Sequence, residues 1–189
     1  NAGFADLNAF FVLAPWLFLL LVPALSMRSF AEEKRTGTLE LLLTKPLSLW
    51  QILLGKYIVN LMLLLTALLP TVVYFFAIDA LKLGDNPIDW GSAISAYCGL
   101  FCVGASYVAL GIFSALLTKS QATAFMLALL LCFLQFYVWK GIAELMKDQG
   151  LYRFFNAVGI FEHFLNLRQG VVTLKDIVYF LGFNYIVLY

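Results

Sequence analysis

Residues 28–48 read Arg-Ser-Phe-Ala-Glu-Glu-Lys-Arg-Thr-Gly-Thr-Leu-Glu-Leu-Leu-Leu-Thr-Lys-Pro-Leu-Ser, a charged stretch between two long apolar runs. Its four consecutive charges, Glu32 to Arg35, would face all sides of a helix, and none of them enters a bilayer at low cost. Gly37 follows, and a glycine permits a sharp change of chain direction. The stretch therefore predicts an amphipathic element at a membrane surface, held between two membrane spans.

The composition of the whole chain indicates an integral membrane protein. Of its 189 residues, 63% are hydrophobic and only 12% are charged, whereas soluble domains have about 25% charged residues. The mean hydropathy is +0.92. The net charge is +1 and there is no long basic run, so nucleic-acid binding is not expected. Cys98, Cys102 and Cys132 lie in apolar runs without metal-binding spacing and are expected to be buried packing residues.

The apolar runs have the length of membrane-spanning helices, which need about 20 residues each. Strands of a membrane barrel would alternate in polarity over about ten residues, and these runs do not alternate. We therefore expect an all-α protein with one transmembrane domain over residues 1–189. The expected spans cover about 7–27, 50–78, 90–117, 120–139 and 176–189, of which the last is truncated.

Polar residues predict where the helices around the charged stretch begin. Ser29 and Glu32 have the spacing of a capping box, so a helix is expected to continue or to restart there. Ser48 and Gln51 have the same spacing at the start of the next span. Lys56 is expected to bury its aliphatic stem and to extend its amine to the membrane interface.

Positive charge in short loops predicts orientation, because such loops remain in the cytoplasm. Five basic residues lie in or next to the loop 28–49, whereas the loop 79–89 has one lysine and three aspartates. We expect the loops 28–49 and 117–120 in the cytoplasm, and the segments 79–89 and 140–175 outside.

The segment 140–175 alternates aromatic and polar residues, which is typical of short amphipathic helices in a membrane interface. We expect it to cap the bundle without crossing it, since its charges lie too close together for a re-entrant hairpin. His163 lies among these aromatics. A packing role is the simpler interpretation, and a ligand pair with Glu162 is the alternative.

Ionisable side chains are absent from the apolar runs, and Lys56 lies at the end of one. This absence argues against a proton- or sodium-coupled carrier and against an intramembrane protease. Polar residues such as Ser106 and Gln135 are expected to form interhelical hydrogen bonds, with a polar lining for a substrate path as the alternative.

Two motifs resemble the ABC-2 type family of ABC transporter permeases. Residues 32–48, followed by Leu53-Leu-Gly-Lys-Tyr57, are similar to the loop between the second and third spans of that family. The second match lies before the last span, at His163, Arg168, Gly170 and Asp176, where Gln169 interrupts an Arg-Gly-Val stretch seen in many such permeases. The resemblance covers nearly the whole chain and is closest to the gliding-motility-associated permease subunits of Bacteroidetes.

The resemblance implies a helical bundle that corresponds to spans two to six of six, so we expect the chain to be part of a longer protein of the bacterial inner membrane. It also implies that the loop is a cytoplasmic coupling helix that docks on a separate ATP-binding subunit, and that permeases pair with a second copy or a paralogue among membrane lipids. The matching docking residues are Glu32, Glu33, Lys34, Arg35, Thr36, Gly37, Thr38, Leu39 and Glu40.

The chain lacks a Gly-x-x-x-x-Gly-Lys-[Ser/Thr] sequence, so we expect no ATPase site, no cofactor, no catalytic residue and no metal ligand in it. ATP and Mg²⁺ would be bound by the partner, and the 32–44 loop would transmit the effect of hydrolysis to an export permease. Two alternatives remain open: a non-transporting membrane scaffold that holds a cytosolic protein, and a secondary transporter.

Overall fold

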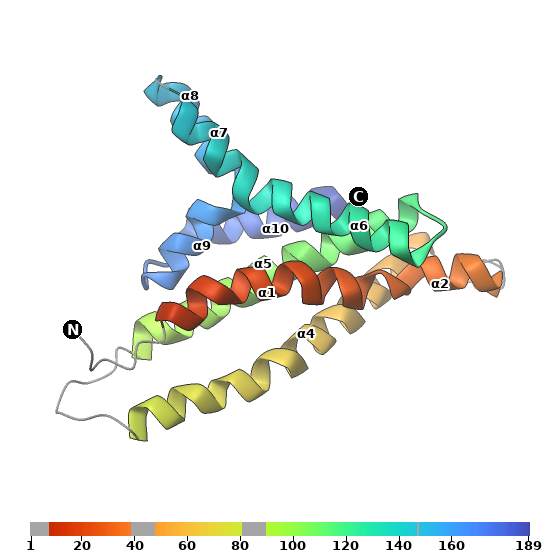
Figure 1. Ribbon diagram of the computed structural model, residues 1–189, viewed down its shortest axis with the longest axis horizontal. Helices are drawn as coiled ribbons and strands as arrows, with labels where there is room; N and C mark the ends of the chain where they lie inside the picture. The colour runs from red at the N-terminus through yellow and green to blue at the C-terminus, as the bar shows by residue number, and fades with distance from the viewer. Residues whose placement is uncertain (1–7, 39–47, 81–89, 147) are drawn as a thin grey trace.

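The described part of the chain is a bundle of helices without strands (Figure 1). The computed structural model describes residues 8–38, 48–80, 90–146 and 148–189. The helices are α1 (Asn8–Ser26), α2 (Arg28–Thr36), α4 (Leu49–Ala80), α5 (Trp90–Leu117), α6 (Gln121–Phe133), the π-helical η1 (Leu134–Val138), α7 (Trp139–Leu145), α8 (Gln149–Val158), α9 (Ile160–Arg168) and α10 (Leu174–Leu188). Residues 39–47 and most of the expected loop 79–89 lie outside the described residues.

Four helical stretches are long and apolar enough to cross a membrane, which confirms the expected all-α membrane fold. They are Ala9–Phe30, Leu49–Tyr74, Trp90–Leu117 and Gln121–Leu145. Trp90–Leu117 is the central one, because 72% of its most apolar window is buried, against 44% or less for the other three. Helices α1, α4, α6, α9 and α10 all pack against it.

Small residues on α5 allow this close packing. A Cβ atom added at Gly111 would lie 1.8 Å from Ser26 Oγ on α1, and one added at Gly104 would lie 2.5 Å from the Leu64 side chain on α4. Real Cβ atoms do not approach other atoms so closely, so a side chain at residue 111 would displace Ser26, whereas one at residue 104 would push only the flexible end of Leu64. Ala105 and Ala109 of α5 are also buried, so small residues lie at several positions of this helix surface.

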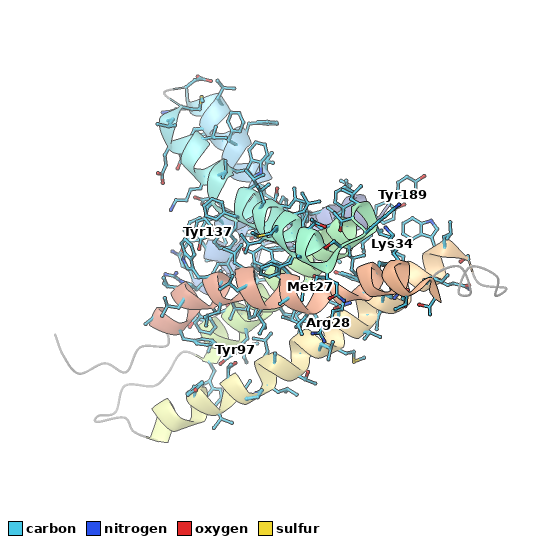
Figure 2. All side chains as sticks on the ribbon, turned by 45° about the vertical axis from the view of Figure 1, so that its right-hand side comes forward. Met27, Arg28, Lys34, Tyr97, Tyr137 and Tyr189 are labelled. Atoms are coloured by element: carbon cyan, nitrogen blue, oxygen red, sulfur yellow. The ribbon has the colours of Figure 1, made fainter. Side chains whose placement is uncertain are left out.

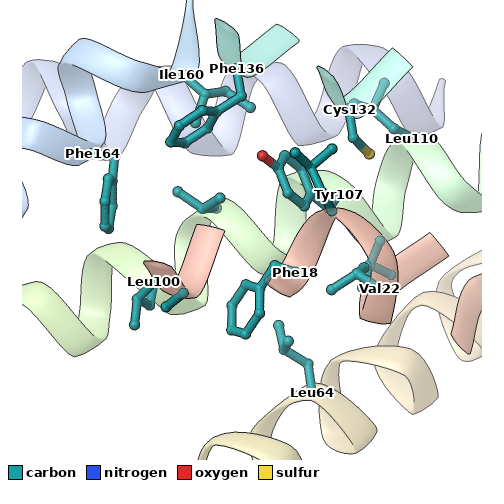
Figure 3. Packing of buried hydrophobic residues seen from close by; sticks show 14 of the residues in the cluster. Phe18, Val22, Leu64, Leu100, Tyr107, Leu110, Cys132, Phe136, Ile160 and Phe164 are labelled. Carbon is teal, nitrogen blue, oxygen red and sulfur yellow. The ribbon is translucent and has the colours of Figure 1, made fainter. Parts of the chain in front are cut away.

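The core lies around α5 and receives side chains from every neighbouring long helix (Figure 3). Its members include Phe18, Val22, Leu64, Leu100, Tyr107, Leu110, Cys132, Phe136, Ile160 and Phe164. Cys132 is fully buried, as predicted, whereas Cys98 is exposed and Cys102 is half-buried.

The segment after α6 differs from the expectation. Helix α6 continues through η1 and α7 to Leu145, beyond the expected end at residue 139. Helices α7 and α8 then pack against each other and project from the bundle (Figure 1). Helix α9 was expected to lie in the membrane interface, but one face of it is buried in the bundle. Its residues His163, Phe164 and Leu167 are buried against the bundle, because α5 rather than lipid covers its apolar face.

Candidate functional site

Helix α2 carries the start of the first predicted motif, residues 32–36, and continues almost directly from α1. The backbone N–H of Met27 donates to Pro23 O at 2.9 Å, so the helical path is barely interrupted. Met27 itself is helical and no side chain caps α2, so the expected capping role of Ser29 is wrong. The predicted break at Gly37 is confirmed, because this residue ends α2 with a left-handed φ of 73°.

Lys56 of α4 connects α4 to α2. Its amine lies 2.6 Å from Glu33 Oε1, also donates to the backbone oxygen of Ser29, and lies 4.6 Å from the centre of the Phe30 ring. One turn along α4, the Asn60 amide donates to Ser29 Oγ at 2.7 Å. The Lys56 amine contacts α2 because a carboxylate and a carbonyl oxygen are available there. Its expected place at the membrane interface stays a prediction.

Lys34 connects α2 to the end of α5 (Figure 2). Its amine donates to the carbonyl oxygen of Leu116 and lies 3.4 Å from that of Ala115 and 3.5 Å from that of Thr118. The last carbonyls of a helix have no partner within the helix and carry the negative end of its dipole. The Lys34 amine therefore donates hydrogen bonds to these carbonyl oxygens, and its positive charge interacts favourably with the dipole of α5.

We call Ser29, Glu33, Lys34, Lys56 and Asn60 the α2 joint. It holds α2 against two different long helices by hydrogen bonds and an ion pair in which both side chains are partly buried. A displacement of α2 would therefore act on α4 and α5 directly. The joint has no arrangement for bond chemistry, since it lacks a nucleophile activated by a neighbouring base.

The predicted docking residues divide into three groups. Glu33 and Lys34 are half-buried and engaged in the α2 joint. Thr36, Gly37 and Thr38 are exposed at the end of α2. The side chains of Glu32 and Arg35 are not described, and Leu39 and Glu40 lie outside the described residues. Docking of this set on an ATPase subunit stays a prediction.

The second motif forms a buried polar cluster between α9 and α10. His163 Nδ1 lies 2.5 Å from Asp176 Oδ1, and both side chains are at most 4% exposed. Thr173 Oγ1 donates to Asp176 Oδ2 at 2.5 Å, and the Asn166 amide reaches Oδ1 at 3.5 Å. His163 Nε2 lies 3.2 Å from Ala157 O, so the ring is held at both nitrogens. The partner of His163 is therefore Asp176, not Glu162.

Asp176 is the first residue of the expected span 176–189, but it lies ahead of the apolar run of α10 and outside the four stretches long enough to cross a membrane. Burial by itself raises the pKa of the carboxyl group, but the hydrogen bonds from Thr173 and His163 and the charge of His163 outweigh this effect. The pKa of Asp176 therefore lies below its ordinary value, and the group is a carboxylate at neutral pH.

Tyr179 and Gln135 extend the cluster to η1. The Tyr179 ring stacks on His163 with 3.9 Å between ring centres, and its hydroxyl donates to Val158 O at 2.6 Å. The Gln135 amide donates to the same carbonyl at 2.8 Å, which confirms the interhelical hydrogen bond predicted for this residue. Ser106 instead donates within its own helix, to Cys102 O at 3.1 Å.

The other two residues of this motif have separate places. Arg168 lies half-buried in the last turn of α9, away from the His163–Asp176 pair. Gly170 follows α9 with a φ of 82°, and its backbone N–H donates to Leu167 O at 3.2 Å. The motif thus provides one buried pair and the turn that brings its two members together. Within the described ranges, no three His, Cys, Asp or Glu side chains gather as metal ligands.

The sequence analysis predicted neither the role of Asn60 in the α2 joint nor the partner of Lys34. Asn60 lies in an apolar run and is only 4% exposed, and a polar side chain in such a run was the available signal. The Lys34 contact had no local signal, because its partners are backbone carbonyls far along the chain.

The chain is similar to a known protein family over nearly its whole length. A family model described as ABC-2 family transporter protein matches residues 6–188 of the chain. No curated protein matches it.

Proposed function

The chain belongs to the ABC-2 family of transporter proteins, and we propose that this permease subunit exports its substrate with energy that a separate ABC ATPase delivers through residues 32–44. In this proposal the exposed end of α2 and the residues after it dock on the ATPase. The chain itself supplies the membrane path and the mechanical connection, and ATP and Mg²⁺ remain on the partner.

The α2 joint is the observation that carries the proposal. A docking segment transmits force only if it is attached to the elements that must move. Lys56 attaches α2 to α4 through Glu33, and Lys34 attaches it to the end of α5. Because α5 contacts most other helices, a shift at its end would propagate through the bundle.

ATP-driven closure of the ATPase subunits would change the position of α2 between two states of the transporter. Such a change alters the helix arrangement only if the contacts of α2 differ in free energy between the states. The α2 joint supplies contacts that can differ, since its ion pair and hydrogen bonds depend on the spacing of α2, α4 and α5.

Further parts of the proposal rest on sequence resemblance and charge distribution. We place the transporter in the bacterial inner membrane, with residues 28–49 and 117–120 in the cytoplasm and 79–89 and 140–175 outside. The permease would work as a pair, with a second copy or a paralogue. A role in gliding motility is supported only by the resemblance to permease subunits of that system.

Site-specific cross-linking tests the docking direction. In a background without the three native cysteines, Thr38→Cys places a thiol at the exposed end of α2, and Leu145→Cys places one at the 80%-exposed end of α7. We expect Thr38→Cys to cross-link to the co-purified ABC ATPase subunit and Leu145→Cys not to do so. Cross-linking only from Leu145→Cys would refute the docking assignment.

The same complex discriminates the alternative functions. An export permease should change the ATPase rate of its partner and should transport only with ATP. A scaffold would bind its partner without any effect of ATP, and a secondary transporter would work from an ion gradient without the ATPase subunit.

A further inference from the structure

A groove runs between α1 and α4, on the side of the bundle away from α6. Its larger part has a volume of about 830 Å³ and apolar walls that include Leu21, Leu25, Val59 and Leu63. A second hollow of about 520 Å³ shares Leu21 with the first and continues along the same two helices. Both hollows open to the outside of the bundle and lie one after the other along α1 and α4.

One end of the groove is polar and lies at the α2 joint. Arg28, at the start of α2, is exposed and lines the groove with Asn60 and the Glu33–Lys56 pair (Figure 2). Among the side chains that the structure describes, Arg28 has no hydrogen-bond or ion-pair partner. The Glu33 carboxylate is already engaged, since its Oε1 accepts from the Lys56 amine at 2.6 Å.

The cation at the polar end restricts the occupant of the groove. Glu33 and Lys56 pair with each other, so the exposed guanidinium of Arg28 is the charge that remains for a ligand. Arg28 favours a phosphate, which guanidinium groups bind by paired hydrogen bonds. The polar end therefore fits a headgroup that has an anionic phosphate and no cation of its own.

The length and polarity of the rest of the groove fit an acyl chain. The lining residues from Lys56 to Thr71 span 15 positions of α4, which is about 22 Å at 1.5 Å per residue. Half of a hydrocarbon core is about 15 Å thick. The apolar walls thus extend from the polar end past the middle of the membrane.

We propose that this groove is a binding site for an anionic phospholipid. The phosphate binds Arg28, and one acyl chain lies along Leu21 and Leu63. In the orientation proposed above, the lipid belongs to the inner leaflet. The site does not depend on the transported substrate or on the ATPase.

Lipid retention by the intact purified protein tests the proposal. The protein is exchanged into detergent with equal amounts of phosphatidylglycerol and phosphatidylcholine, and the bound lipids are counted by native mass spectrometry. Phosphatidylcholine has the phosphate but also a quaternary ammonium cation, so it carries no net charge. We expect phosphatidylglycerol to be retained with about tenfold preference, because the choline cation offsets the attraction of the phosphate to Arg28.

Two variants and their controls locate the site. Arg28→Gln should remove the preference, whereas Lys119→Gln, at an exposed lysine in the turn after α5, should keep it. Gly55→Phe should remove retention of both lipids, because Gly55 lines the groove and an added Cβ there meets no atom within 4 Å. Gly182→Phe has equally open space on α10 and should retain the lipid.

Equal retention of the two lipids by the unaltered protein would overturn the proposal. Full retention of phosphatidylglycerol by Gly55→Phe would do the same, since the groove is then filled. If Gly55→Phe instead separates a dimer and leaves lipid retention unchanged, a second copy of the chain occupies the groove and the lipid site is rejected. Arg28→Gln keeps the test decisive if Gly55→Phe does not fold.

Discussion

Lys34 on α2 donates a hydrogen bond to the carbonyl oxygen of Leu116 at the end of α5, across 82 positions of sequence. Lys34 belongs to the motif predicted to dock on a partner, and Leu116 belongs to the most buried long helix. The contact makes the end of the central helix a direct neighbour of the proposed docking segment. The docking segment is therefore connected to the bundle by a side-chain contact as well as by the backbone.

Replacing Lys34 by methionine should uncouple the ATPase without releasing it. Met keeps an unbranched side chain but cannot donate to the last carbonyls of α5. We expect Lys34→Met to bind the ATPase subunit as before, while its effect on the ATPase rate in proteoliposomes falls several-fold. Lys119→Met removes a nearby exposed amine and should behave as the unaltered protein. Equal losses in both variants would mean that surface charge, not the contact with α5, matters.

The Glu33–Lys56 pair should contribute measurably to stability. The two side chains are 30% and 18% exposed, so solvent screens them less than a surface pair. In a double-mutant cycle with Glu33→Gln and Lys56→Met, we expect a coupling energy of about 1 kcal/mol in unfolding measurements. A coupling energy of zero would show that this pair does not hold α2 and α4 together.

The crossing of α1 over α5 should reject any side chain at residue 111. A Cβ there would lie 1.8 Å from Ser26 Oγ, so Gly111→Ala is expected to lower the free energy of unfolding by about 1–3 kcal/mol. Removing the opposing hydroxyl in the double variant Ser26→Gly, Gly111→Ala should restore most of this loss. The control is Gly141→Ala, where an added Cβ meets nothing within 4 Å. Failure of Ser26→Gly to rescue would contradict the close approach of the two helices as the cause.

The His163–Asp176 pair should fix α10 to α9. Asp176→Asn removes the carboxylate and leaves a buried histidine without its charged partner, which is expected to cost about 3–5 kcal/mol. Hydrogen exchange should then accelerate in α9 and in the first turn of α10 before it does so in α5. Lys175→Gln, at the exposed neighbouring position, should leave exchange unchanged.

The same pair predicts the effect of acid. The folded pKa of Asp176 lies below its ordinary value, so its contribution to stability is fully present above the unfolded pKa. That contribution is lost as the pH falls through the folded pKa. As the pH falls, the midpoint temperature of thermal unfolding should therefore decrease more for the unaltered protein than for Asp176→Asn. Equal decreases in the two proteins would contradict this expectation.

Sequence patterns predicted the features that depend on neighbouring residues. Gly37 ends α2 as expected, and the capping box at the start of α4 is formed. In that box, Ser48 N–H donates to Gln51 Oε1 at 2.9 Å, and Gln51 N–H donates to Ser48 Oγ at 3.3 Å. Such features join atoms three or four residues apart, so the local sequence contains both partners.

Ser29 does not have the capping role that the local sequence predicts. The pattern was present, but α1 continues into α2, so no free helix start remains for a side chain to cap. The Ser29 hydroxyl then accepts from Asn60 on another helix. A local pattern states what a residue can do, and the packing of α4 decided which partner it has.

The sequence by itself determined the helical membrane class, because apolar runs of about 20 residues must form backbone hydrogen bonds within themselves in a bilayer. Only the tertiary structure decided that α5 is central, that Lys34 and Lys56 hold α2 from two sides, and that α9 is buried. The physical reason is that helix crossings are set by how side chains from distant segments fit together. A charged stretch between two spans was visible in the sequence, but the helices to which it is attached were not.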